Sequence, residues 1–160
     1  MNNSAETASK LLAKWNEVQT AKNAAAGSGA FVVGLSGHLG AGKTSFTKLL
    51  AQELGITEIV TSPTFVIMKI YDIQAGAKIG GVSGTDVSFK RLVHIDAYRL
   101  ERRAELDGLD FERISSDPHN LVIIEWPENA GLGREDVNEW LKLEIVDGVY
   151  SIDPSRYLEQ

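Results

Sequence analysis

The chain has 160 residues, 43% hydrophobic and 24% charged, which is the composition of one ordinary globular domain with a core large enough to fold alone. A formal net charge of −6 argues against a protein whose main task is to bind the nucleic-acid backbone. The absence of cysteine from the sequence excludes disulfides and thiolate metal sites. No apolar stretch is long enough to span a bilayer, and the N-terminus lacks a signal-peptide pattern. We therefore expect a cytoplasmic protein with neither membrane nor DNA as partner.

The first predicted element is an amphipathic helix over residues 4–20. Its apolar side chains recur at helical spacing, in the order Ala8, Leu11, Leu12, Trp15 and Val18. This stripe favours core packing. Residues 23–29 are rich in Ala, Gly and Ser and predict a loop, and the apolar run at 30–35 predicts a strand.

Residues 37–44 read Gly-His-Leu-Gly-Ala-Gly-Lys-Thr and fit the G-x-x-x-x-G-K-[ST] pattern of a phosphate-binding loop, between the predicted strand and an amphipathic helix that begins at Lys43. Glycine lets backbone N–H groups approach phosphate oxygens, and the helix N-terminus favours the same anion. Lys43 is expected to reach the β- and γ-phosphates and Thr44 to supply an oxygen to Mg²⁺. The expected phosphate contacts are Gly37, His38, Leu39, Gly40, Ala41, Gly42, Lys43, Thr44 and Ser45.

Residues 62–65, Ser-Pro-Thr-Phe, form a second candidate segment, in which Pro63 holds Ser62 extended. In phosphate-loop enzymes a mobile threonine loop often senses the γ-phosphate through Mg²⁺, so either Thr64 or Ser62 is a candidate for that role. A plain turn between strands is the alternative.

Strands follow on both sides of a glycine-rich connection. Residues 65–73 and 90–97 predict two antiparallel strands, and residues 74–86 between them predict a flexible link without chemistry. Residues 140–146 and 149–152 predict a later hairpin with a two-residue turn.

Two near-continuous apolar segments each end in a carboxylate, residues 91–96 at Asp96 and residues 120–125 at Glu125. This is the pattern of buried parallel strands, whose carboxyl ends face the ligand in an open α/β sheet. One or both carboxylates should manage Mg²⁺ and water; exposed strand-end acids are the alternative. His94 shares the side of Asp96 by period-two alternation, and either hydrogen-bonds near the metal shell or is a buried structural histidine.

Residues next to these strand ends are weaker candidates. Arg99 is the arginine nearest the expected site, whereas Arg102 and Arg103 are expected to face solvent or a partner. Residues 103–109 and 110–114 suggest short helices. Trp126 either packs over the nucleotide or covers the edge of the core.

Together these segments resemble the bacterial tRNA threonylcarbamoyladenosine biosynthesis ATPase family, TsaE. The matching pieces are G-H-L-G-A-G-K-T-S-F at 37–46, S-P-T-F at 62–65, H-I-D-A-Y-R-L at 94–100 and I-E-W-P-E at 124–128. The resemblance implies an α/β fold of the P-loop NTPase type, three-layered, with a mostly parallel central sheet and some antiparallel strands. We expect one domain over residues 1–153 and a loose tail at 154–160.

The resemblance also implies an activity. The family binds and hydrolyses ATP with Mg²⁺ and works with TsaB and TsaD partner proteins in placing threonylcarbamoyl on adenosine 37 of certain tRNAs, without transferring the group itself and with tRNA contact expected to be indirect. By motif, the catalytic residues would be Lys43, Asp96 and Glu125, the Mg²⁺ ligands Thr44 and Glu125, and further nucleotide contacts Thr64 and Trp126.

The chain departs from the family at His38, where Asp is usual, and at Ser45, where Thr is common. Ser45 preserves a hydroxyl, whereas His38 replaces an acid with a group that can carry positive charge beside phosphate. Nucleotide affinity or its pH dependence is therefore expected to differ.

Two other functions compete with an ATPase that drives or resets a protein assembly. A small-molecule kinase would share the size, the phosphate loop and the arginines at 99–103. A GTP-dependent switch lacks support, because neither an N-K-x-D sequence nor a D-x-x-G sequence after Asp96 occurs. Because nothing in the sequence other than Arg99 clearly supplies an arginine in cis, we expect slow turnover by the chain alone and stimulation by its partners.

Overall fold

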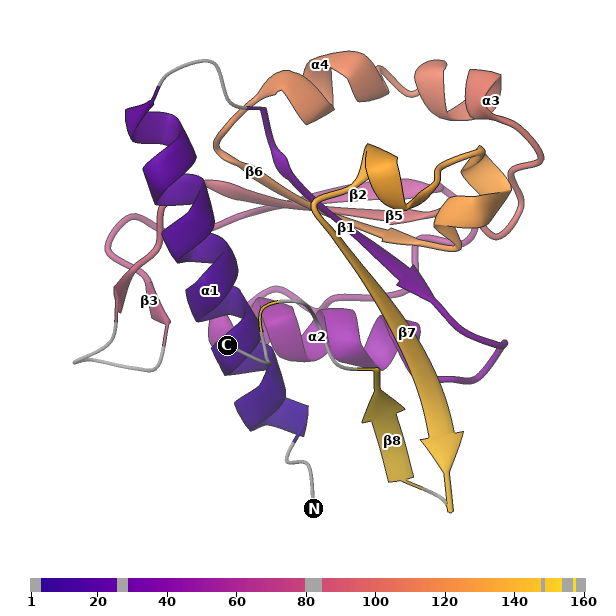
Figure 1. The fold of residues 1–160 in the computed structure, drawn as a ribbon, viewed down its shortest axis with the longest axis horizontal. Coiled ribbons are helices and arrows are strands. Elements are labelled where there is room, and N and C mark those ends of the chain that lie inside the picture. Colours follow the sequence, from indigo (N-terminus) through magenta and orange to yellow (C-terminus); the bar gives the residue numbers. More distant parts are fainter. Residues whose placement is uncertain (1–3, 26–28, 80–84, 148, 154–156, 158–160) are drawn as a thin grey trace.

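A six-stranded sheet in the order β2-β5-β6-β1-β7-β8 forms the centre of the molecule (Figure 1). The computed structural model describes residues 4–25, 29–79, 85–147, 149–153 and 157. The sheet strands are β1 (Phe31–Ser36), β2 (Met68–Asp72), β5 (Arg91–Asp96), β6 (Asn120–Glu125), β7 (Glu139–Val146) and β8 (Val149–Ile152). The helices are α1 (Ser4–Ala24), α2 (Lys43–Glu53), α3 (Arg103–Asp107) and α4 (Phe111–Ser116), with 3-10 turns η1 (Pro127–Ala130) and η2 (Arg134–Asp136).

The centre of the sheet is parallel and its two edges are antiparallel. β5 pairs with β6, β6 with β1, and β1 with the first half of β7, all in parallel, whereas β2 runs against β5 and β8 against β7. In the β5–β6 ladder, Asp96 lies directly opposite Glu125. The two predicted parallel strands are therefore neighbours, and their terminal carboxylates share one edge of the sheet.

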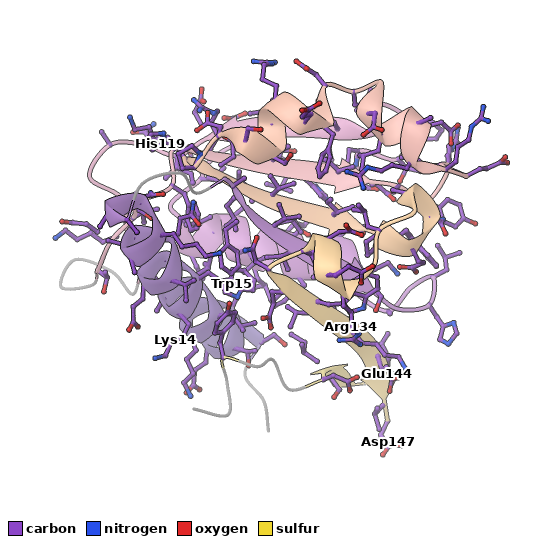
Figure 2. The ribbon with its side chains drawn as sticks, turned by 45° about the horizontal axis from the view of Figure 1, so that its top comes forward. Lys14, Trp15, His119, Arg134, Glu144 and Asp147 are labelled. Carbon is purple, nitrogen blue, oxygen red and sulfur yellow. The ribbon has the colours of Figure 1, made fainter. Side chains whose placement is uncertain are left out.

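The first helical layer, α1 and α2, covers one face of the sheet. Figure 2 shows Trp15 on the side of α1 that faces the sheet, while Lys14 points away; the Trp15 ring stacks on that of Phe31 with centroids 5.7 Å apart. Leu92 on β5 and Leu121 on β6 belong to the same core cluster. Because side chains alternate along a strand, His94, Asp96 and Glu125 also point to this face.

The second helical layer, α3 and α4, covers the opposite face (Figure 1). Its core cluster joins Phe111 and Ile114 of α4 to Val93 and Ile95 of β5. The central strands are thus buried on both faces, which is why they read as continuous apolar runs. The predicted three-layer α/β fold with a mostly parallel sheet is confirmed.

Two predicted boundaries were wrong, and one short hairpin was not predicted. α1 continues to Ala24, beyond the predicted end near residue 20, because alanine is the best helix former. β2 begins only at Met68, since Ile67 has a φ of 69° and donates its N–H to Pro63, which makes the preceding residues a turn. The glycine-rich connection contains a short hairpin, β3 (Lys78–Ile79) with β4 (Thr85–Asp86), and its residues 80–84 lie outside the described part.

The predicted C-terminal hairpin is confirmed by the β7–β8 pairing, with Val146 opposite Val149 and Asp147 at a φ of 52° in the turn; Gly148 lies outside the described residues. The predicted loose tail falls on residues of which only Tyr157 is described, and the Tyr157 ring lies 6.3 Å from that of Phe31. None of the described helices combines the length and apolar character needed to cross a membrane.

Candidate functional site

The phosphate-loop sequence connects β1 to α2 and has the backbone that its glycines allow. Gly37, Gly40 and Gly42 have φ values of 142°, 81° and 96°, in the region that residues with a Cβ avoid. At Gly37 a Cβ would also lie under 3.0 Å from the backbone oxygen of Leu143 on β7. Gly42 is the N-cap of α2, so the positive end of that helix opens directly onto the loop.

Lys43 folds back over its own loop. Its Nζ donates to the carbonyl oxygens of Gly37 at 2.6 Å and His38 at 2.9 Å, and lies 4.1 Å from the ring centroid of Trp126. Only 5% of the residue is exposed. Burial lowers the pKa of the ammonium, and the opposing attraction of nearby carboxylates, Glu125 first, does not offset that effect.

Thr44, in the first turn of α2, contacts the carboxylate at the end of β6. Its hydroxyl donates to Glu125, with Oε1 at 3.0 Å and Oε2 at 3.1 Å. Glu125 is 3% exposed, and its Oε2 also accepts a hydrogen bond from Nε2 of the fully buried His94. The two expected Mg²⁺ ligands therefore lie side by side, supported by a third residue.

Asp96, at the end of β5, is bound by the Ser-Pro-Thr segment. Its Oδ2 accepts from the hydroxyls of Thr64 at 2.8 Å and Ser62 at 3.3 Å, and the two hydroxyls are 2.6 Å from each other. Its Oδ1 accepts from the backbone N–H of Tyr98 at 3.0 Å. The Ser-Pro-Thr segment is thus tied to one of the two strand-end carboxylates.

A pocket of about 330 Å³ joins these groups. It is lined by Leu39, Gly40, Gly42, Lys43, Thr44, Ser45, Ser62, Thr64, Asp96, Tyr98, Glu125 and Trp126. Three expected phosphate contacts lie outside this lining: Gly37 and His38 turn their carbonyls to Lys43, and Ala41 is buried in the core.

Two aromatic residues form one wall of the pocket. The rings of Tyr98 and Trp126 lie 5.3 Å apart, and Trp126 has a φ of 58°, which turns the chain sharply after β6. Sequence reasoning assigned no role to Tyr98, although its position two residues after Asp96 places it just beyond the strand end. Arg99, the preferred arginine, is exposed and lies outside the pocket lining, with its guanidinium 4.8 Å from the ring centroid of Phe65.

The hydroxyl and carboxylate oxygens of this site suit a hard cation that takes its other ligands from a bound substrate. Within the described residues, no group of three or more His, Asp or Glu side chains could hold a metal ion. Mg²⁺ is usually held by one or two protein oxygens together with substrate phosphates. The hydroxyl of Thr44 and the carboxylate of Glu125 fit that requirement.

A mostly parallel α/β sheet, with a glycine loop between its first parallel strand and the following helix and carboxylates at the neighbouring strand ends, defines a protein of the P-loop NTPase fold class. The family model described as "Threonylcarbamoyl adenosine biosynthesis protein TsaE" matches residues 2–150. The chain belongs to the TsaE family, which takes part in the biosynthesis of threonylcarbamoyladenosine in tRNA.

Individual relatives agree with this assignment. The chain is 37% identical to a tRNA threonylcarbamoyladenosine biosynthesis protein TsaE of Streptomyces coelicolor over 71% of this chain and 67% of the relative. It is 48% identical to that of Bacillus subtilis over 49% of this chain and 41% of the relative. A crystal structure of Bacillus subtilis YdiB is similar with a TM-score of 0.53 and 28% identity, covering 95% of this chain and 79% of that one.

Proposed function

We propose that the chain is the Mg²⁺-dependent, ATP-binding and ATP-hydrolysing component of the cytoplasmic machinery that forms threonylcarbamoyladenosine at position 37 of tRNA. In this proposal it acts with TsaB-like and TsaD-like proteins and touches tRNA only indirectly. The observation that carries the proposal is the meeting of Lys43, Thr44, Asp96 and Glu125 in one pocket at the N-terminus of α2. Family membership supports the pathway.

Binding begins at the loop and the first turn of α2. The backbone N–H groups around Gly40 and Gly42 and the helix N-terminus attract the polyphosphate of ATP. The Lys43 ammonium then leaves the carbonyl oxygens of Gly37 and His38 and binds phosphate oxygens instead. Thr44 and Glu125 would hold Mg²⁺, which would supply positive charge to neutralise the phosphates.

Hydrolysis needs a positioned water. Water attacks the γ-phosphorus, the bond to the β–γ bridging oxygen breaks, and ADP leaves with that electron pair, while the proton of the water passes to the solvent and inorganic phosphate is formed. Because Glu125 is assigned to Mg²⁺ together with Thr44, which it contacts, we assign orientation of the water to Asp96. Thr64 and Ser62 hold the Asp96 carboxylate in place.

Partner stimulation is part of the proposal. Among the described residues, no arginine lines the pocket, so the isolated chain has no arginine in place to add to the charge stabilisation that Lys43 and the loop N–H groups supply to the transferring phosphoryl. We expect slow hydrolysis by the chain alone and faster hydrolysis with the partner proteins. Full-speed hydrolysis that partners leave unchanged would contradict this mechanism.

Two substitutions test the division of roles. Lys43→Ala should abolish phosphate-dependent affinity, because among the described residues Lys43 is the one cation that lines the pocket. Glu125→Ala should weaken the Mg²⁺ dependence of binding more than nucleotide binding itself. Calorimetric titration with ATP, with and without Mg²⁺, measures both effects. Equal losses in the two variants would refute the assignment, and a pull-down with the candidate partners, with and without ATP, tests the assembly.

A further inference from the structure

We infer that His94 is a positioning residue that holds the Glu125 carboxylate in place for a divalent cation; this inference rests on the proposed function. His94 lies on β5 and Glu125 on β6, and their side chains share the face covered by α2. A carboxylate only accepts hydrogen bonds, so Nε2 of His94 carries the hydrogen in this contact.

Cation binding changes which contacts can hold Glu125. Among the described residues, the hydrogen bonds to its carboxylate come from the Thr44 hydroxyl and from His94. A cation held by Thr44 and Glu125 would compete for the carboxylate oxygens that now accept from Thr44. His94 then remains as the side chain that fixes the orientation of the carboxylate.

Packing alone does not account for a histidine at this position. The ring is fully buried, and within the described residues its Nδ1 has no hydrogen-bond partner. A buried polar atom without a partner is unfavourable, and a leucine of similar volume would fill the space without one. The polar contact that the imidazole does make goes to Glu125.

The expected effect is on cation affinity. Partners that orient a metal ligand typically change metal affinity by about 10–100-fold when they are removed. Loss of the His94 donor should therefore raise the Mg²⁺ concentration for half-maximal enhancement of ATP binding at least about tenfold. Affinity for ATP without Mg²⁺ should change less than about twofold, since His94 is not among the residues that line the pocket.

Three substitutions of His94 separate the effect of losing its hydrogen-bond donor from the effect of changing its side-chain volume. His94→Leu removes the donor. His94→Gln puts an amide nitrogen the same number of bonds from Cα as Nε2, whereas the amide of His94→Asn is one bond shorter and reaches only the place of Nδ1. We expect Gln to retain most of the Mg²⁺ response and Leu and Asn to lose it. His119→Gln is the matched control, because His119 immediately precedes β6 and so lies at the end of that strand opposite Glu125 (Figure 2).

The measurement is a fluorescence titration with an N-methylanthraniloyl ATP analogue over a range of Mg²⁺ concentrations, with thermal unfolding as the check on folding. A normal Mg²⁺ response in a folded Leu or Asn variant would overturn the inference, as would equal losses in Gln and Asn. If Leu does not fold, the Gln and Asn pair decides. A wild-type chain that binds ATP without any Mg²⁺ response would instead refute the proposed function.

Discussion

Replacing Gly37 with alanine should destabilise the whole fold, because this residue joins the loop to β7. Alanine at a φ of 142° carries backbone strain of about 1–3 kcal/mol. Its Cβ would lie under 3.0 Å from a backbone oxygen, where ordinary contact begins at 3.4 Å, so β1 and β7 must separate; such overpacking costs about 1–3 kcal/mol. At about 4 kcal/mol in all, and about 2–4 °C per kcal/mol, the Tm should fall by roughly 8–16 °C.

Gly40→Ala is the matched control for that substitution. Gly40 has a φ of 81°, but nothing lies within 4 Å of a Cβ placed there. Backbone strain alone, about 1 kcal/mol, should lower the Tm by roughly 2–4 °C. Thermal unfolding of the ligand-free variants, followed by circular dichroism, measures both. If Gly37→Ala lost no more stability than Gly40→Ala, the close contact with β7 would not matter and the reasoning would fail.

Two further predictions concern α1 and the turn before β6. Asn16→Ala should lower the free energy of urea unfolding by about 2–3 kcal/mol, because the buried Asn16 side chain accepts hydrogen bonds from both the N–H and the hydroxyl of Ser88. The exposed control Glu17→Ala should change it by no more than about 0.5 kcal/mol. Similar losses in the two variants would contradict the prediction. The backbone N–H of His119 lowers the pKa of Asp117 below its usual 3.8, so this carboxylate stabilises the fold above that pH. The contribution disappears as the pH falls through the lower pKa of the folded state, so Asp117→Asn should make the free energy of urea unfolding fall less steeply with decreasing pH below pH 4. Parallel curves of unfolding free energy against pH for the variant and the wild type would refute this prediction.

Local sequence patterns were sufficient where spacing alone determines structure. The loop at 37–44 and the parallel strands at 91–96 and 120–125 lie where they were predicted, because continuous apolar runs arise only when both faces of a strand are buried. Alternation also placed His94 on the side of Asp96 correctly. The chemical roles of these residues stay predictions.

Long-range pairing was beyond reach of local patterns. The hairpin at the C-terminus was predicted from its turn, but the parallel pairing of β7 with β1 joins residues about a hundred positions apart and has no local signature. The bend that shortens β2 depends on Ile67 in a conformation that β-branched residues seldom adopt, so propensity pointed to a strand. Likewise, no spacing rule shows that Lys43 folds onto its own loop.

The register of β5 against β6 has a consequence for how this protein can fail. Asp96 and Glu125 are partners across one rung, so their separation is set by main-chain pairing and not by the surrounding loops. A slip of either strand by one residue would turn its acid to the α4 side of the sheet. A misaligned chain could then keep its secondary structure and yet present a single acid to the loop, so tests of folding that report only helix and strand content would pass a protein without a complete site.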